Sequence, residues 1–126
     1  MTNLSKLQPY LEQLIHTSPN DHAFLIVTVS GTEDFLQMTG DSGGVQLDFP
    51  LVTGRQQSME STIRMVADRN GLVLVENRGS DGSRFLDIDL SADAAGAARV
   101  CEILLREVFA VDNTTGLEFA GDGIDF

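Results

Sequence analysis

Few side chains in this 126-residue chain are of the types that carry out chemistry. The two histidines, His16 and His22, fall at the end of the first expected helix and just before the first expected strand. No G-x-S-x-G motif accompanies them, so nothing points to a serine nucleophile that either histidine would activate. The pattern favours surface or boundary positions for both histidines over a catalytic role.

Two carboxylates, Asp87 and Asp89, lie two residues apart on an expected strand and therefore project from the same face. General acid–base catalysis would require burial or a close partner to shift the pKa of one of them. The alternating apolar residues between and around them indicate that these acids face outward, which favours a solvated face. A small enzyme or ligand-binding site built from Arg84, Asp87 and Asp89 is the alternative.

The glycine-rich segments and the single cysteine do not indicate a cofactor or metal site. Residues 40–44 (GDSGG) lie between two expected strands and no lysine follows, which favours a hairpin loop over a phosphate-binding loop. Residues 121–125 lack the ligand spacing and the final glutamate of a calcium loop. Cys101 is the only cysteine and falls in an apolar helical stripe, so we expect a buried structural thiol.

The charge excludes nucleic acid as a partner. The chain has 8 Lys and Arg against 19 Asp and Glu, a formal net charge of −11, and no basic stripe to contact phosphates. Such an excess of acid is explained by solubility, the favoured interpretation, or by a basic partner. The sequence has neither a secretory signal nor the roughly 20 apolar residues of a membrane helix, so we expect a soluble cytoplasmic protein without membrane contact.

Hydrophobic periodicity predicts eight elements in the order α-β-β-β-α-β-β-α. The first expected helix covers residues 4–15, and the middle helix follows a Ser58 N-cap and ends at Asn70-Gly71. The last expected helix is capped by Ser91, and its buried stripe comprises Ala94, Ala98, Cys101, Leu105 and Val108. The expected strands cover residues 23–29, 35–39, 45–51, 72–76 and 84–90. This is an α+β domain of residues 1–126 with an antiparallel sheet of about five strands. We expect the first and last helices on one sheet face, and an acidic tail, residues 112–126, that docks or frays.

The alternation along the strands divides the side chains between the two sheet faces. If Leu25, Leu36, Val45, Leu86 and the residues in phase with them face the helices, the other face presents an apolar patch for a partner protein: Phe24, Ile26, Phe35 and Phe85. A third layer, formed by the middle helix or the tail, is the alternative cover for this face. The middle-helix face around Met59, Ile63 and Val66 is the candidate interface of a homodimer.

Three segments carry a family resemblance: residues 35–38 (FLQM) before the glycine-rich turn, 45–49 (VQLDF), and 103–111 (ILLREVFAV). Together with the element order, size and acidity, they resemble the type III secretion chaperone-like superfamily of peptide-binding chaperones over residues 22–118. The Leu-Gly-Trp-like element common among relatives is missing after the middle helix, so no family binding residue is transferred. The resemblance implies a small bacterial non-enzymatic protein, often dimeric, that binds an extended segment of a partner protein. An enzyme and a structural or regulatory subunit are the alternatives.

Overall fold

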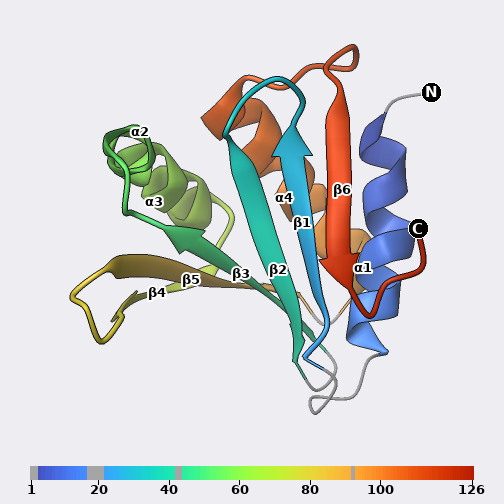
Figure 1. The fold of residues 1–126 in the computed structure, drawn as a ribbon, viewed down its shortest axis with the longest axis horizontal. Helices are drawn as coiled ribbons and strands as arrows, with labels where there is room; N and C mark the ends of the chain where they lie inside the picture. The colour runs from blue at the N-terminus through green and yellow to red at the C-terminus, as the bar shows by residue number, and fades with distance from the viewer. Residues whose placement is uncertain (1–2, 17–21, 42–43, 92) are drawn as a thin grey trace.

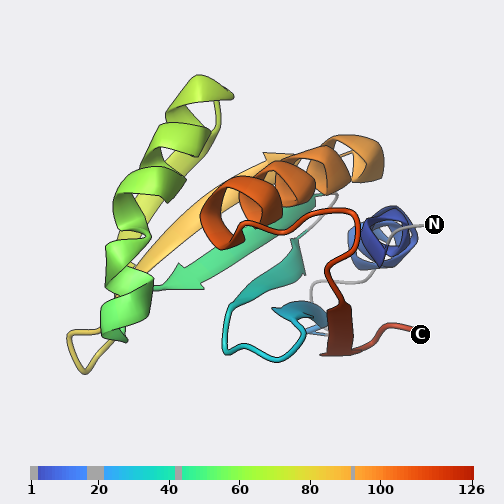
Figure 2. The same ribbon diagram turned by 90° about the horizontal axis from the view of Figure 1, so that it is seen from above.

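The computed structural model describes residues 3–16, 22–41, 44–91 and 93–126, and shows an α+β domain with one antiparallel sheet of six strands. The strands are β1 (Phe24–Val29), β2 (Phe35–Asp41), β3 (Gly44–Pro50), β4 (Val73–Arg78), β5 (Arg84–Ser91) and β6 (Leu117–Asp122). The helices are a 3-10 turn η1 (Asn3–Lys6), α1 (Leu7–Ile15), α2 (Gly54–Ser58), α3 (Glu60–Arg69) and α4 (Ala94–Phe109). The strand order is β4-β5-β3-β2-β1-β6, and the helices lie on one side of the sheet (Figures 1 and 2).

The core lies between the sheet and its helices, and the predicted alternation of the strands is confirmed. Val27, Met38, Leu47 and Ile88 all face the helices and are at most 1% exposed. Each strand alternates with period 2, so burying one set of side chains sends every intervening residue to the opposite face. The predicted hairpin loop joins β2 to β3, although its centre, residues 42–43, lies outside the described residues.

The first and last helices pack on the same face of the sheet, as predicted, and α1 also contacts α4. The approach of α1 to the sheet is close at one glycine. An ideal Cβ built on Gly40 of β2 would lie 2.3 Å from the backbone oxygen of Leu14 in α1. Only glycine allows the helix to lie this near the strand, because any other residue would push the two backbones apart.

The sheet has six strands, not the expected five, because the tail forms β6. Residues 117–122 pair antiparallel with β1 and place Leu117 opposite Val29 in the core. On the helix side, the ring of Phe119 meets the ring of Tyr10 in α1, with 5.1 Å between centroids. The ring of Phe126 also meets that of Tyr10 edge-on, again with 5.1 Å between centroids. These ring contacts and the pairing with β1 hold the tail against the domain.

The middle helix differs from its prediction in its start and in its exposure. It consists of α2 and α3, and the N-cap is Thr53, not Ser58, because Thr53 and Gln56 form a capping box. The predicted end is confirmed by Asn70 as the C-cap, with Gly71 at φ +66°. The predicted dimer contacts are within the monomer core: Met59, Ile63 and Val66 are 9%, 1% and 0% exposed. Burial in the core leaves these three side chains inaccessible to a second copy.

The N-cap of the last helix lies two residues later than predicted. Asp93 is the N-cap of α4, accepting hydrogen bonds from the backbone N–H groups of Ala95 and Gly96, whereas Ser91 is the last residue of β5. The buried stripe comprises Ala94, Ala97, Cys101, Leu104 and Leu105, with the predicted Ala98 and Val108 half-buried beside it. Arg106 forms an ion pair with Glu102, one turn earlier on α4, at 3.0 Å.

We predict that Leu105→Ala lowers the free energy of unfolding by about 2–5 kcal/mol, because Leu105 is fully buried and its truncation leaves a cavity. Arg99→Ala, at an exposed position on the same helix, is the control and is expected to cost less than about 0.5 kcal/mol. Urea denaturation of both variants measures the difference. Equal stabilities would contradict the assigned orientation of α4.

Candidate functional site

The candidate site is the sheet face opposite the helices, here called the open face. No helix of the described residues covers it (Figure 2). The strand registers arrange its side chains in rows that run across the sheet, from β4 to β6. The central row comprises Val75, Asp87, Asp48, Gln37, Ile26 and Ala120. A parallel row comprises Val73, Asp89, Gln46, Thr39, Phe24 and Asp122.

The four apolar residues predicted for partner binding occupy this face. Phe24 and Ile26 come from β1, Phe35 from the start of β2 and Phe85 from the start of β5. All four side chains are half-buried, because neighbouring residues on adjacent strands cover part of each one. The structure therefore places them together on one face but exposes only part of each. Two valines on the edge strand β4 are more exposed, Val73 at 65% and Val75 at 51%.

Two carboxylates face each other at the centre of the open face. Asp48 of β3 lies directly opposite Asp87 of β5, and the Gln46 side chain donates a hydrogen bond of 3.1 Å to Asp48. Burial of the Asp48 carboxyl, with its contact to Asp87, raises its pKa to about 6. Like charges opposite each other in adjacent strands are destabilising. The pair therefore holds unfavourable negative charge that a cation would relieve.

A hollow of about 320 Å³ surrounds this carboxylate pair. Its lining residues come from four adjacent strands, with carboxylates, amides and apolar groups all represented: Gln37, Asp48, Pro50, Asn77, Phe85 and Asp87. The Asn77 side chain donates a hydrogen bond to the Asp87 carboxylate, which orients that carboxylate in the hollow. An aromatic ring next to carboxylates suits a cationic group with an apolar stem, because the ring and the charges both attract it.

The alternative enzyme site is not assembled. Arg84 projects to the helix side of β5, whereas Asp87 and Asp89 lie on the open face, so the three side chains do not converge. The even spacing between Arg84 and its buried neighbours Leu86 and Ile88 places it on their face. Asp87 and Asp89 do share a face, as predicted, with Asp89 the more exposed.

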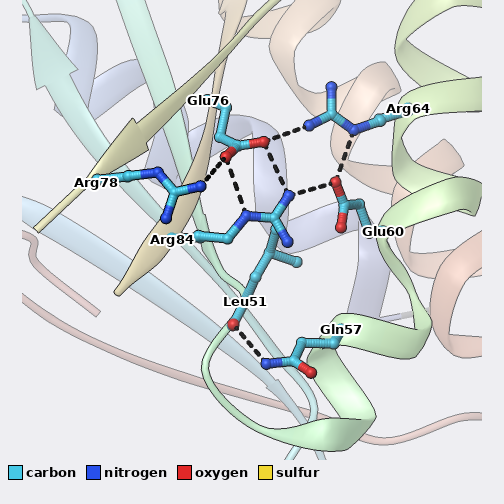
Figure 3. Close-up of polar contacts among 7 residues, drawn as sticks. All are labelled: Leu51, Gln57, Glu60, Arg64, Glu76, Arg78 and Arg84. Atoms are coloured by element: carbon cyan, nitrogen blue, oxygen red, sulfur yellow. Dashed lines mark hydrogen bonds and ion pairs between the residues drawn. The ribbon is translucent and has the colours of Figure 1, made fainter. Parts of the chain in front are cut away.

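Arg84 instead forms the centre of an ion-pair network between α3 and the β4–β5 hairpin (Figure 3). Its guanidinium lies 2.8 Å from Glu60 of α3 and 2.8 Å from Glu76 of β4. Arg64 contacts the same two carboxylates, at 2.9 Å and 2.8 Å. Hydrogen bonds from Arg84 lower the pKa of Glu76 to about 2 and also lower the pKa of Glu60. These carboxylates are ionised at neutral pH, which suits an anchor for α3 and not a proton donor.

A pocket of about 220 Å³ lies where α2 and the end of α4 meet the start of β2, and we call it the rim pocket. Its lining is Glu33, Asp34, Phe35, Phe49, Thr53, Arg55, Gln56, Met59 and Phe109. Arg55 makes two 2.6 Å hydrogen bonds to Asp34, which raise the pKa of the guanidinium. The rings of Phe49 and Phe109 stack 6.3 Å apart. Asp34 and Arg55 neutralise each other and the two rings lie beside them, so the rim pocket is suited to an apolar side chain.

The remaining candidates from the sequence are dispersed. His16 is the C-cap of α1 and His22 precedes β1, both exposed. Cys101 is fully buried, and burial raises the pKa of its thiol to about 12, so the prediction of a structural thiol is confirmed. Within residues 3–16, 22–41, 44–91 and 93–126, no three His, Cys, Asp or Glu side chains are grouped to hold a metal ion. No helix in these ranges has the length and apolarity to cross a membrane.

Comparison with protein-family models, curated proteins and solved structures gives no match to this chain. Any function therefore has to be argued from the geometry of the open face and its pockets.

Sequence reasoning missed two parts of the site. The opposition of Asp48 and Asp87 depends on β3 pairing with β5, two strands that are separated in the chain by α2, α3 and β4. The Asp34–Arg55 pair joins residues 21 positions apart, and no motif marks it. The capping box at Thr53 and Gln56 was the one available signal, because the spacing T-x-x-Q is visible in the sequence.

We predict that Asp48→Asn raises the free energy of unfolding by about 1 kcal/mol at about pH 7.5, after allowance for solvent screening. The pKa of Asp48 rises from 3.8 to about 6 on folding, so the native state favours the proton and loses stability as the pH rises through this interval. The stability gained by Asp48→Asn should fall to a small fraction of this value at about pH 4, because Asp48 of the native wild type is then protonated. Urea titrations of the variant and wild type at both pH values measure the difference.

Asp68→Asn is the matched control, because Asp68 is exposed on α3. It removes the same charge without touching the open face. A control that gains as much stability as Asp48→Asn would show that overall charge, and not the carboxylate pair, causes the effect.

Proposed function

We propose that this protein is a non-enzymatic cytoplasmic module that binds an extended segment of a partner protein on the open face. The observation that carries the proposal is the division of the sheet. One face is covered by helices, whereas the other leaves half-buried aromatic and aliphatic side chains, such as Phe24 and Ile26, beside hydrogen-bonding groups. Exposed apolar surface rimmed by polar residues is typical of protein-interaction sites.

The shape of the site supports a chain segment over a small metabolite. The rows of the open face cross all six strands, about 24 Å at the usual strand spacing. The hollow at Asp48 and Asp87 lies open on this surface, and the rim pocket is a separate depression near Phe35. A long face with shallow depressions fits a segment with several side-chain anchors, in the manner implied by the chaperone-like resemblance.

We also propose a homodimer, formed through the edge strand β4. This strand pairs with β5 alone among the described residues and carries the exposed Val73 and Val75. A free edge strand is a template for pairing with another strand, and a twofold axis would pair β4 with its own copy. Such a dimer would join two open faces into one continuous surface.

The binding function is tested by selecting peptides from an unbiased random library on the immobilised chain. Selected peptides are expected to shift amide NMR signals of β1, β2, β3 and β5. Phe24→Ser should weaken them about tenfold, the loss typical of an interface anchor. Met65→Ser, at a 51% exposed apolar position on α3, is the control and should leave binding unchanged. Selection of no peptide, or shifts confined to α1 and α4, would refute the proposal.

The dimer is tested by analytical ultracentrifugation across about two decades of concentration around the micromolar range typical of weak interfaces. We expect a reversible monomer–dimer equilibrium in the wild type and a monomer in Val75→Lys, because like charges would then meet across the paired edges. Val52→Lys is the control, since Val52 is 56% exposed but lies before α2 and not on the edge. A wild type that stays monomeric throughout would rule out this dimer.

A further inference from the structure

The charges of the open face have one sign. Asp48, Asp87 and Asp89 lie on β3 and β5, and Glu118 and Asp122 lie on β6. No lysine, arginine or histidine of the described residues stands in the rows of this face. At neutral pH the face therefore presents up to five negative charges around its apolar residues.

The chain's own cations are engaged elsewhere. Six of its 8 basic side chains form ion pairs with carboxylates outside the open face: Arg55, Arg64, Arg69, Arg78, Arg84 and Arg106. A second copy of this chain is a poor partner for the open face, because face-to-face packing would bring two sets of negative charges together. Phosphate groups of nucleic acids or anionic membranes would be repelled in the same way. The complementary occupant is a cationic protein segment.

The acidic groups are arranged in two clusters with apolar residues between them. Asp48 and Asp87 lie on one side of Ile26 in the central row, and Asp122 of β6 lies beyond Phe24 in the parallel row. From β3 to β6 there are three strand spacings, about 14 Å. An extended chain spans about 13 Å in four residues, and its side chains at positions i, i+2 and i+4 point to the same face.

We propose that the open face binds a segment that carries two basic residues four positions apart with an apolar residue midway between them. This inference rests on the proposed function and specifies the chemistry of its partner. One basic side chain enters the hollow between Asp48 and Asp87, with its stem against Phe85. The apolar residue packs on Phe24 and Ile26, and the second basic side chain reaches the acids of β6.

The contact with the carboxylate pair makes binding depend on pH. The groups facing Asp48 are Gln46 on its own strand, Gln37 of β2 and Asp87 of β5, and no helix of the described residues covers them. Its pKa of about 6 means that Asp48 is protonated at about pH 5 and gains its charge as the pH rises through about 6. A bound cation favours the ionised form, so affinity should rise over the same interval.

The test uses nine-residue peptides of sequence Ser-Ser-Arg-Ser-Leu-Ser-Arg-Ser-Ser, with capped ends, titrated into the full chain and followed by NMR. A twin with citrulline in place of both arginines keeps the shape but loses the charge. An isomer with the two arginines adjacent keeps the charge but loses the spacing. We expect the citrulline twin to bind at least about tenfold more weakly, and the isomer about threefold more weakly, at low salt.

Variants locate the contact. Asp87→Asn should weaken the arginine peptide about fivefold, whereas Asp68→Asn on α3 should leave its affinity unchanged. Asp89→Asn, at an exposed position, provides a second variant on the face if Asp87→Asn fails to fold. The increase in affinity from about pH 5 to about pH 7 should be lost in Asp48→Asn.

The outcomes separate this inference from the function on which it rests. Equal affinity of the arginine and citrulline peptides, or library-selected peptides that bind the open face without basic residues, would overturn the inference and leave peptide binding in place. Equal affinity of the spaced and adjacent arginine peptides would overturn the proposed spacing. Failure of every peptide, selected or designed, to shift the open face would refute the function and the inference together.

Discussion

The register between β3 and β5 is the constraint from which the fold and the candidate site both follow. On the helix side, Leu47 lies opposite Ile88 and Phe49 opposite Leu86, and all four are at most 2% exposed. Because strand side chains alternate, this packing forces Asp48 opposite Asp87 on the other face. A slip of one residue would expose the core and bury the carboxylates, so the hydrophobic core maintains an electrostatically unfavourable pair.

The ion-paired arginines of the α2, α3 and β5 region lie on the helix side of the sheet. On the helix side, Arg84 and Arg64 link α3 to β4 through two shared carboxylates, and Arg55 joins α2 to the β1–β2 turn through Asp34. These pairs add polar links at the margin of the sheet, where α2 buries no side chain and α3 packs through one apolar stripe. Acidic side chains that contact the helices are thus paired with arginines, whereas the acids of the open face have no basic partner among the described residues.

The sequence was most informative where a single period covers a whole element. The alternation over residues 45–51 and 84–90 predicted both strands and the direction of their side chains, because burial on one face imposes period 2. The strand in the tail was harder to predict, because the glycines and acids around Leu117 and Phe119 give only a weak pattern of alternation. Its pairing depends on the free edge of β1 and on the ring of Tyr10, which no local pattern reveals.

Local sequence patterns also could not decide where helices begin or how the candidate site is assembled. Thr53 and Ser58 are both capable caps, and the choice falls to Thr53 because Gln56 completes the reciprocal hydrogen bonds. Met59, Ile63 and Val66 form an apolar stripe that the sequence assigns equally well to a core or to an interface. The outward orientation of Asp87 and Asp89 was predictable, but the opposition of Asp48 and Asp87 requires knowing that β5, and not β4, pairs with β3.

Because Cys101 is buried on the sheet-facing side of α4, its rate of reaction reports how often α4 separates from the sheet. The thiol is fully enclosed between α4 and the sheet, with its sulfur 3.8 Å from that of Met38, and its pKa of about 12 leaves almost no thiolate at neutral pH. An alkylating reagent can reach the only cysteine of the chain after α4 has separated from β2. The rate of alkylation under native conditions therefore measures how often the helical layer detaches, without any engineered label.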